Sequence, residues 1–357
     1  MQLGIIGFPG AGKTTVFNAL TGSQLPTGEW ASGGRFEVQT AVVDVPDARL
    51  EALSERFSPR KTTHLKVTYA DVGGLQSGAG REGLPGPLVN QLEQMDGLLH
   101  VVRAFEDPDH PHPAGDINPR RDIQAMETEF LLSDMLVVER RLERLAEEKQ
   151  KGARERAIIE REIAFFQKLD DALSEEKPLR RLALAPEEAR LLTGFGLLSR
   201  KPVLVVINIG EGDQGPKVGD LGEGMGCISL QGKLEMEIAQ LPAEERQDYL
   251  QEFGIQEPGR ERVIRASHEL LDLTAFFTMN EQELRAWTIP RGSAALEAAG
   301  TVHSDLARGF IRAEIIAWEK LLELGGLAEA RAAGKLRLEG KDYVVADGEV
   351  IYIRFNI

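Results

Sequence analysis

The feature that most constrains this chain is a glycine-rich run near its start, Gly7-Phe8-Pro9-Gly10-Ala11-Gly12-Lys13-Thr14. The run fits the pattern G-x-x-x-x-G-K-[ST] and lies between an apolar segment, residues 2–6, and a segment of helical composition, residues 13–20. Such a loop points successive backbone N–H groups at phosphate oxygens, and the start of the following helix adds a favourable dipole. The sequence therefore predicts a strand, a phosphate-binding loop and a helix, with ATP or GTP as the ligand. Lys13 would reach the β- and γ-phosphates, and the Thr14 hydroxyl would bind Mg²⁺.

A second motif, Asp71-Val72-Gly73-Gly74, ends another apolar segment, residues 64–70, and has the D-x-x-G form of a switch in GTPase-like proteins. In that form the aspartate, here Asp71, holds Mg²⁺, and the second glycine, here Gly74, offers its N–H to the γ-phosphate. The next residue is Leu75, where Ras-like enzymes carry the glutamine that orients the attacking water. Because leucine cannot orient water, we expect the mechanism to differ from that of Ras.

A third motif, Asn208-Ile209-Gly210-Glu211, follows the apolar segment 202–207, at the place where GTPases carry N-K-x-D. In N-K-x-D the aspartate accepts two hydrogen bonds from guanine and the lysine packs over the base. Glu211 and Ile209 stand in those two places, so the geometry that selects guanine is altered. We expect Asn208, Ile209 and Glu211 to line the base site and guanine selectivity to be weak.

Apolar segments that alternate with helical ones run through the first three quarters of the chain. Four of them have the length and composition of buried strands, at residues 2–6, 64–70, 97–104 and 202–207. Strands that alternate with helices predict an α/β fold with a doubly wound sheet. The length of 357 residues indicates two or three folding units.

Residues 122–199 interrupt this alternation. The centre of the interruption, residues 139–162, carries eight basic and seven acidic side chains, which is typical of a solvated helical surface. Apolar residues at helical spacings lie on both sides of Gly152, namely Leu142, Leu145, Ile159, Ile163 and Phe166. The pattern predicts two antiparallel helices with their tip near Gly152, and a pair of ordinary surface helices is the alternative.

The sequence changes character again from residue 273. We expect strands at residues 273–279 and 284–290, a helix near 310–324, and a hairpin at 344–357 with its turn at Asp347-Gly348. These elements predict a small, separate, β-rich domain.

Composition limits the possible settings of the protein. A net charge of −15 argues against a surface that coats nucleic acid as a whole, although a local basic face remains possible. No apolar run approaches the ~20 residues of a membrane-spanning helix, and no cleavable segment precedes the phosphate loop. The single cysteine, Cys227, suits a reducing compartment, and we expect it to be buried. Together these features predict a cytoplasmic protein without a membrane partner.

The chain resembles the YchF or Obg-like ATPase family of P-loop proteins over nearly its whole length. The matching stretches include residues 7–20 (GFPGAGKTTVFNAL), 45–50 (VPDARL), 100–105 (HVVRAF), 285–290 (RAWTIP) and 334–357 (GKLRLEGKDYVVADGEVIYIRFNI). The resemblance implies a nucleotide domain (1–121 plus 200–272), an inserted helical, coiled-coil hairpin (122–199) and a C-terminal, ubiquitin-like β-grasp domain of the TGS type (273–357). Members of the family hydrolyse ATP, many also GTP, and associate with ribosomes.

The resemblance also implies roles for particular residues. Residues 10–15, Thr15 included, would contact the phosphates, and His112 matches a histidine that has been considered for catalysis in the family; a loop histidine between prolines is the alternative. One departure stands out, because the threonine of the family's first switch is missing at residues 33–35 (Gly-Gly-Arg). Thr40 lies five residues further on and is the nearest substitute.

We therefore expect a slow, Mg²⁺-dependent ATPase, with GTP as a second substrate, that acts as a monomer and a ribosome- or RNA-associated switch. Candidate cationic contacts at the hairpin tip are Lys151, Arg154 and Arg156. A nucleotide-gated binding module without hydrolysis, and a guanine-selective GTPase, are the alternatives.

Overall fold

The structure is a computed structural model that describes residues 1–27, 38–72, 84–152, 154–252 and 257–356. The chain divides into two compact units. Unit 1 comprises Met1–Val43 and Thr68–Leu270, and unit 2 comprises Asp44–Val67 and Leu271–Ile357. The predicted motif residues Gly73, Gly74 and Leu75, and the first-switch residues 33–35, lie outside the described residues.

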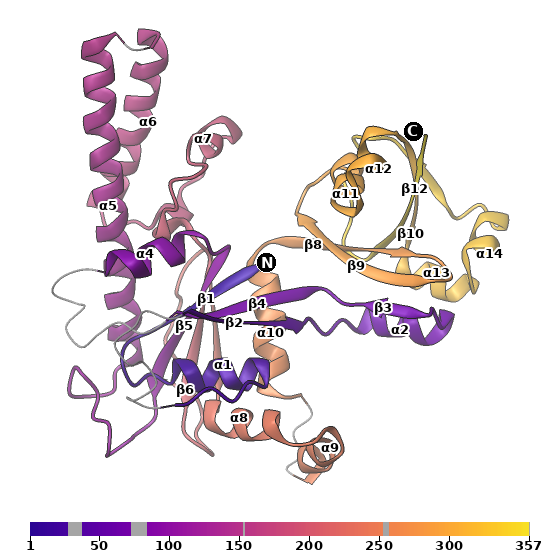
Figure 1. The fold of residues 1–357 in the computed structure, drawn as a ribbon, viewed down its shortest axis with the longest axis horizontal. Helices are drawn as coiled ribbons and strands as arrows, with labels where there is room; N and C mark the ends of the chain where they lie inside the picture. Colours follow the sequence, from indigo (N-terminus) through magenta and orange to yellow (C-terminus); the bar gives the residue numbers. More distant parts are fainter. Residues whose placement is uncertain (28–37, 73–83, 153, 253–256, 357) are drawn as a thin grey trace. The chain divides into compact units, whose positions relative to one another are not determined.

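Unit 1 is built on a six-stranded sheet with the order β2-β4-β1-β5-β6-β7 (Figure 1). The strands are β1 (Gln2–Ile6), β2 (Val38–Asp44), β4 (Lys66–Val72), β5 (Gly97–Ala104), β6 (Val203–Ile209) and β7 (Met225–Leu230). Neighbours from β4 to β7 pair in parallel. This confirms the predicted α/β fold and all four predicted strands, while β2 and β7 were not predicted.

Helices cover both faces of this sheet. The helices of unit 1 are α1 (Lys13–Thr21), α4 (Gly86–Glu93), α5 (Pro119–Lys151), α6 (Arg156–Ser174), α7 (Pro186–Leu191), α8 (Gly232–Gln240), α9 (Ala243–Glu252) and α10 (Gly259–Leu270), with the 3-10 turns η2 (Leu179–Arg181) and η3 (Leu198–Arg200). Apolar residues of α4 and of the first turns of α5 pack on β1, β5 and β6, and α10 packs on β6 and β7. None of the helices in the described ranges is long and apolar enough to cross a membrane.

The helices α5 and α6 form the predicted antiparallel pair (Figure 1). Helix α5 begins after Asn118, whose side chain accepts a hydrogen bond from the Arg121 N–H, and ends at Gly152 in the left-handed conformation. The predicted seam is real, since Leu145, Ile159 and Phe166 are buried in a core of the pair's own. The tip prediction at Gly152 is therefore confirmed.

A buried carboxylate fastens the base of this pair to the sheet. Asp134 of α5 accepts hydrogen bonds from the backbone N–H groups of Leu198 and Ser199, each at 2.8 Å, directly before β6. Burial raises the pKa of Asp134 to about 6. The contact orients the hairpin through two charge-assisted hydrogen bonds rather than through apolar packing alone.

Unit 2 contains a second six-stranded sheet with the order β11-β10-β12-β8-β9-β3. Its elements are α2 (Ala48–Phe57), β3 (Lys61–Thr63), β8 (Leu273–Met279), β9 (Glu283–Pro290), α11 (Ala295–Val302), α12 (Ser304–Arg308), β10 (Phe310–Ala317), α13 (Trp318–Leu324), α14 (Leu327–Ala332), β11 (Arg337–Glu339) and β12 (Glu349–Phe355). Strands β8 and β9 confirm the prediction. Strand β3 lies in residues 44–67, the segment of unit 2 that interrupts unit 1 in the chain. It pairs in parallel with β9, which the sequence did not indicate. The three domain boundaries inferred from the resemblance remain a prediction.

Two predictions for unit 2 are wrong. Residues 310–317 form strand β10 rather than a helix, and only Trp318–Leu324 is helical. The physical reason is an alternation that the helix prediction overlooked: Ala313 and Ile315 face the core, whereas Arg312 and Glu314 face the other side. The predicted hairpin at 344–357 is also absent among the described residues, because β12 pairs with β10 and β8 instead. Asp347-Gly348 does turn the chain, and Asp347 Oδ1 accepts a hydrogen bond from the Ala275 N–H at 2.8 Å.

The prediction of a buried cysteine is wrong as well. Cys227 is a free thiol on β7 and is exposed. Strand β7 is the last in its sheet, so one side of the strand lacks a neighbouring strand in the described part of the chain.

Candidate nucleotide-binding site

The phosphate loop connects β1 to α1, at the carboxyl edge of the parallel strands, as predicted. Gly12 immediately precedes α1 with φ +86°, which favours glycine, and a Cβ there would lie 2.3 Å from the Asn208 Nδ2 atom. A Cβ on Gly7 would lie 2.3 Å from the Val101 carbonyl oxygen on the neighbouring strand β5. Both glycines are therefore required by close packing, and the loop is held tightly against β5 and β6.

The Lys13 side chain folds back over its own loop. Its Nζ atom donates to the carbonyl oxygens of Gly7 at 3.0 Å and Phe8 at 3.1 Å. Burial lowers the pKa of Lys13 to about 8, an effect that the nearby Asp71 carboxylate opposes. A buried ammonium that is bound only by carbonyl oxygens is well suited to exchange them for phosphate oxygens.

The two predicted Mg²⁺ ligands lie together. Thr14 Oγ1 donates to Asp71 Oδ2 at 2.8 Å, although 57 positions separate them in the sequence. The register of the sheet explains this proximity, because Asp71 at the end of β4 is the partner of Ile5 on β1. Burial raises the pKa of Asp71, and the Thr14 hydroxyl and the Lys13 ammonium oppose this shift.

Asn208 is buried, and its amide binds the phosphate loop and the start of α8. Its Nδ2 donates to the Ala11 carbonyl at 3.0 Å, and its Oδ1 accepts from the Gly232 N–H at 3.1 Å, directly at the start of α8. The side chain thus ties the loop, the end of β6 and helix α8 together. Of the other predicted base contacts, Ile209 is buried at the end of β6 and Glu211 is exposed in the loop that follows.

Two residues that sequence reasoning missed, Arg103 and Phe105, lie beside the loop at the end of β5. The buried Arg103 guanidinium donates to the backbone carbonyls of Phe105, Asp107 and His110, and its Cζ lies 4.8 Å from the centre of the Phe105 ring. A Cβ on Gly10 would lie 3.2 Å from Arg103 Nη1, which places this cation against the phosphate loop. The only signal in the sequence was their position at the end of a buried strand.

His112, predicted for catalysis from the resemblance, is buried near the start of α5. Its Nε2 lies 3.0 Å from Asp122 Oδ2, and its Nδ1 accepts from the Ala114 N–H at 3.2 Å. Because Nδ1 is an acceptor, the proton of a neutral ring lies on Nε2 and is donated to Asp122. With both nitrogens engaged, the ring orders the loop before α5, and a catalytic role would require it to leave this position.

The comparisons with known proteins agree with this geometry. A family model described as "50S ribosome-binding GTPase" matches residues 2–141. A second model, YchF-GTPase_C, described as "Protein of unknown function (DUF933)", matches residues 273–356. The Ribosome-binding ATPase YchF of Bacillus subtilis is 41% identical and that of Pasteurella multocida 38% identical, each over 100% of this chain and at least 99% of the relative.

The chain belongs to the YchF family. The solved structure of the Schizosaccharomyces pombe YchF GTPase matches with a TM-score of 0.84 at 28% identity, over 99% of this chain and 97% of that one. The resemblance stated from the sequence is thereby confirmed, and so is the fold of a P-loop NTPase with a YchF-type C-terminal domain. The individual site roles, including those of Gly10, Thr15, Gly74 and Glu211, remain predictions.

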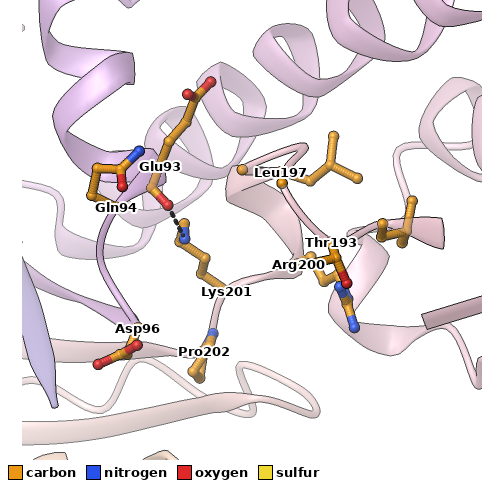
Figure 2. Close-up of a pocket in the computed structure, with 11 residues that line it drawn as sticks. Glu93, Gln94, Asp96, Thr193, Leu197, Arg200, Lys201 and Pro202 are labelled. Carbon is orange, nitrogen blue, oxygen red and sulfur yellow. Dashed lines mark hydrogen bonds between the residues drawn. The ribbon is translucent and has the colours of Figure 1, made fainter. Parts of the chain in front are cut away.

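A cavity of 460 Å³ lies at the opposite edge of the same sheet from the phosphate loop, where β5 and β6 begin (Figure 2). Lys201 donates there to the carbonyls of Glu93 at 3.0 Å and Met95 at 2.6 Å, and so caps the C-terminus of α4. Lys201 directly follows the turn η3 that Asp134 holds. The YchF fold in this chain thus connects α4 to the hairpin through one short segment.

Replacement of Asn208 tests its contact with the loop. We expect Asn208→Ala to raise the Kd for nucleotide about tenfold, because the Gly232 N–H and the Ala11 carbonyl lose buried partners. ATP, GTP and inorganic tripolyphosphate should weaken equally, as measured by calorimetry. A loss confined to one base would instead show that Asn208 reads the base.

The depressed pKa of Lys13 predicts a pH dependence of nucleotide binding. Phosphates favour charged Lys13, whereas above pH 8 the free protein has lost this proton and must regain it on binding. The Kd for ATP should be flat below about pH 7.5 and rise about tenfold per pH unit above 8. Lys13→Arg, which stays charged, is the control; a flat wild-type profile up to pH 9.5 would contradict the assignment.

Proposed function

We propose that this chain is a Mg²⁺-dependent ATPase that hydrolyses ATP slowly, accepts GTP as a second substrate and associates with ribosomes as a nucleotide-regulated factor. The observation that carries the proposal is the 2.8 Å contact between Thr14 Oγ1 and Asp71 Oδ2 beside the Lys13 ammonium. These three groups are the ones that P-loop NTPases use at the metal and the terminal phosphates. The relatives are named ribosome-binding ATPases, which supports both ATP and the ribosome.

The donor set fits Mg²⁺. Thr14 and Asp71 supply hard oxygen atoms, and proteins commonly hold Mg²⁺ with one or two carboxylates together with substrate phosphates. Within the described ranges there is no group of three or more His, Cys, Asp or Glu residues that could hold a metal ion. When bound, Mg²⁺ would neutralise phosphate charge, while Thr14 and Asp71 would hold it in exchange for their mutual hydrogen bond.

The preference for adenine over guanine is proposed from the residues that replace the lysine and aspartate of N-K-x-D in the third motif. Asn208 holds the Ala11 carbonyl and the Gly232 N–H, so the frame of the base site is kept although its neighbours in the motif differ. Glu211 is exposed and Ile209 cannot hydrogen-bond through its side chain, so the paired acceptors that select guanine are altered here. This supports the use of ATP and leaves GTP as a weaker alternative.

Slow hydrolysis is proposed from residue identities. Leu75 replaces the water-orienting glutamine, and the first switch lacks its threonine at residues 33–35. The substitute considered for that threonine, Thr40, lies on β2, and β4 separates β2 from β1. Thr14 and Asp71 are the proposed metal ligands, because their oxygen atoms already lie 2.8 Å apart.

A guanine-selective GTPase is the second candidate, favoured by the GTPase description of the family model on residues 2–141. A nucleotide-gated module without turnover is the third, and Leu75 favours it. Ribosome association would place the protein in the cytoplasm; its action as a monomer remains a prediction from the sequence.

The hydrogen bonds of unit 1 suggest how the nucleotide site could influence the hairpin. Helix α4 follows the Asp71 motif in the chain, and Lys201 holds its C-terminal carbonyls. Leu198 and Ser199, on the same short segment as Lys201, hold Asp134 of α5. A shift of α4 would thus be passed to the base of the hairpin through residues 198–201.

Turnover and binding measurements test the proposal. We expect Mg²⁺-dependent release of phosphate from ATP, abolished by Lys13→Ala and by EDTA, and a Kd for ATP no weaker than that for GTP. Wild-type protein should co-sediment with purified ribosomes to an extent that differs between ATP and ADP.

The controls separate the three candidates. A more than tenfold preference for GTP would establish the GTPase, and ATP binding without Lys13-dependent turnover would establish the binding module. Equal sedimentation with ATP, with ADP and without nucleotide would contradict a ribosome association that the nucleotide regulates.

A further inference from the structure

The three cations predicted as ribosome contacts at the hairpin tip already pair with carboxylates of the same hairpin. Lys151 pairs with Glu147 at 3.0 Å and Arg156 pairs with Glu160 at 3.0 Å. Arg154 is held by both Glu148 and Glu162. Phosphate at this tip would have to compete with carboxylates at each of these positions.

Charge is divided unevenly between the two units. Unit 2 has 17 acidic and 15 basic residues, which leaves unit 1 with −13 of the net −15. A polyanion is therefore repelled far more by unit 1 than by unit 2. Unit 2 is therefore the more favourable unit for a contact with a polyanion.

One face of the unit 2 sheet carries more arginine side chains than carboxylates. Arg312 on β10 and Arg354 on β12 are direct cross-strand partners, so their side chains lie on the same face. The next pair on this face, Glu314 and Tyr352, is equally direct. Arg331 of α14 reaches the same carboxylate, since Glu314 Oε2 accepts from its guanidinium at 2.8 Å. We define the arginine face as Arg312, Arg331, Arg354, Glu314 and Tyr352.

The charges on the arginine face do not balance. The nearly buried carboxylate of Glu314 is shared by Arg331 and Arg354, and no ion pair of Arg312 is found among the described residues. The face therefore carries three positive charges against one negative. Like charges placed directly opposite each other on neighbouring strands destabilise a sheet, so the Arg312 and Arg354 pair costs stability unless an anion binds between them.

The chemistry of the arginine face favours phosphate. A guanidinium group binds phosphate oxygens through two parallel hydrogen bonds. Two guanidinium groups side by side can each bind one of two successive phosphates of a nucleic acid strand, whereas a single carboxylate ligand would occupy only one of them. Leu338 of β11, the partner of Glu314 on its other side, is 54% exposed and offers an apolar contact at the edge of the face. Helix α11 lies away from it, because α11 covers the opposite, core-facing side of β10.

We propose that the arginine face of unit 2 is a contact for the phosphate backbone of RNA, and that Arg312 is its central cation. The inference rests on the proposed ribosome association and names the surface that would carry it. Arg354 and Arg331 contribute through the charge that Glu314 does not neutralise, while Glu314 holds both guanidinium groups in place. The hairpin tip is not needed for this contact.

The test is co-sedimentation of the full chain with purified ribosomes, and with protein-free ribosomal RNA, over a range of salt concentrations. Arg312→Gln should weaken binding to both by about five- to tenfold and lower the slope of log K against log salt by about one. Arg312→Glu should weaken it further, and Arg312→Lys should retain most of it. Arg60→Gln is the matched control: Arg60 is exposed just before β3, at the other edge of the same sheet, and the same charge is removed.

The outcomes separate this inference from the proposed function. Arg312→Gln should fold normally, with an unchanged or raised Tm, because it removes a like-charge pair. Wild-type protein that binds neither ribosomes nor RNA would refute ribosome association itself. Wild-type binding with an unchanged Arg312→Gln, or with an equal loss in Arg60→Gln, would overturn the arginine face alone. A loss on ribosomes but not on protein-free RNA would assign the face to a ribosomal protein and overturn the RNA contact.

Discussion

The nucleotide site depends on one buried amide, that of Asn208. It holds the Ala11 carbonyl of the phosphate loop and the Gly232 N–H of α8, and it lies so close to Gly12 that any side chain there would collide with it. The loop is thereby ordered before any phosphate arrives, which reduces the entropy that binding must overcome. Lys13 and Thr14, by contrast, hold temporary partners that a nucleotide and its metal would replace: the carbonyls of Gly7 and Phe8, and the carboxylate of Asp71.

The division between a fixed frame and exchangeable contacts extends over unit 1. At the carboxyl edge of the sheet, the end of β6 carries Asn208 and the end of β4 carries Asp71. At the opposite edge, residues 198–201 hold α4 through Lys201 and the hairpin through Asp134. Both edges use charged or amide groups bound to backbone atoms, whose positions are set by the strands. Unit 2 has little net charge and presents more arginines than carboxylates on one face of its sheet, so the unit that binds nucleotide and the surface proposed to meet RNA are electrostatically distinct.

The sequence predicted what local patterns determine and missed what distant pairing determines. The phosphate loop, the seam of the hairpin and the four buried strands each rest on spacings within a few residues, and all were correct. Strand β3 has only three residues and is defined by pairing Lys61 with Glu283, so it carries no local signal. The role of Asn208 depends on Gly232, 24 residues later, and that of Arg103 on the fold of the loop it binds. Residues 310–317 are the exception, because the alternation of core-facing Ala313 and Ile315 with Arg312 and Glu314 was a local signal that the helix prediction overlooked.

A crystal structure with Mg²⁺ and a nonhydrolysable ATP analogue would show which contacts of the site are fixed and which are exchanged. We expect the Asn208 contacts to Ala11 and Gly232 to persist, Lys13 Nζ to exchange the Gly7 and Phe8 carbonyls for phosphate oxygens, and Thr14 and Asp71 to separate around the metal. A structure in which Lys13 stays on its carbonyls, or in which Asn208 leaves the loop to bind the base, would contradict this expectation.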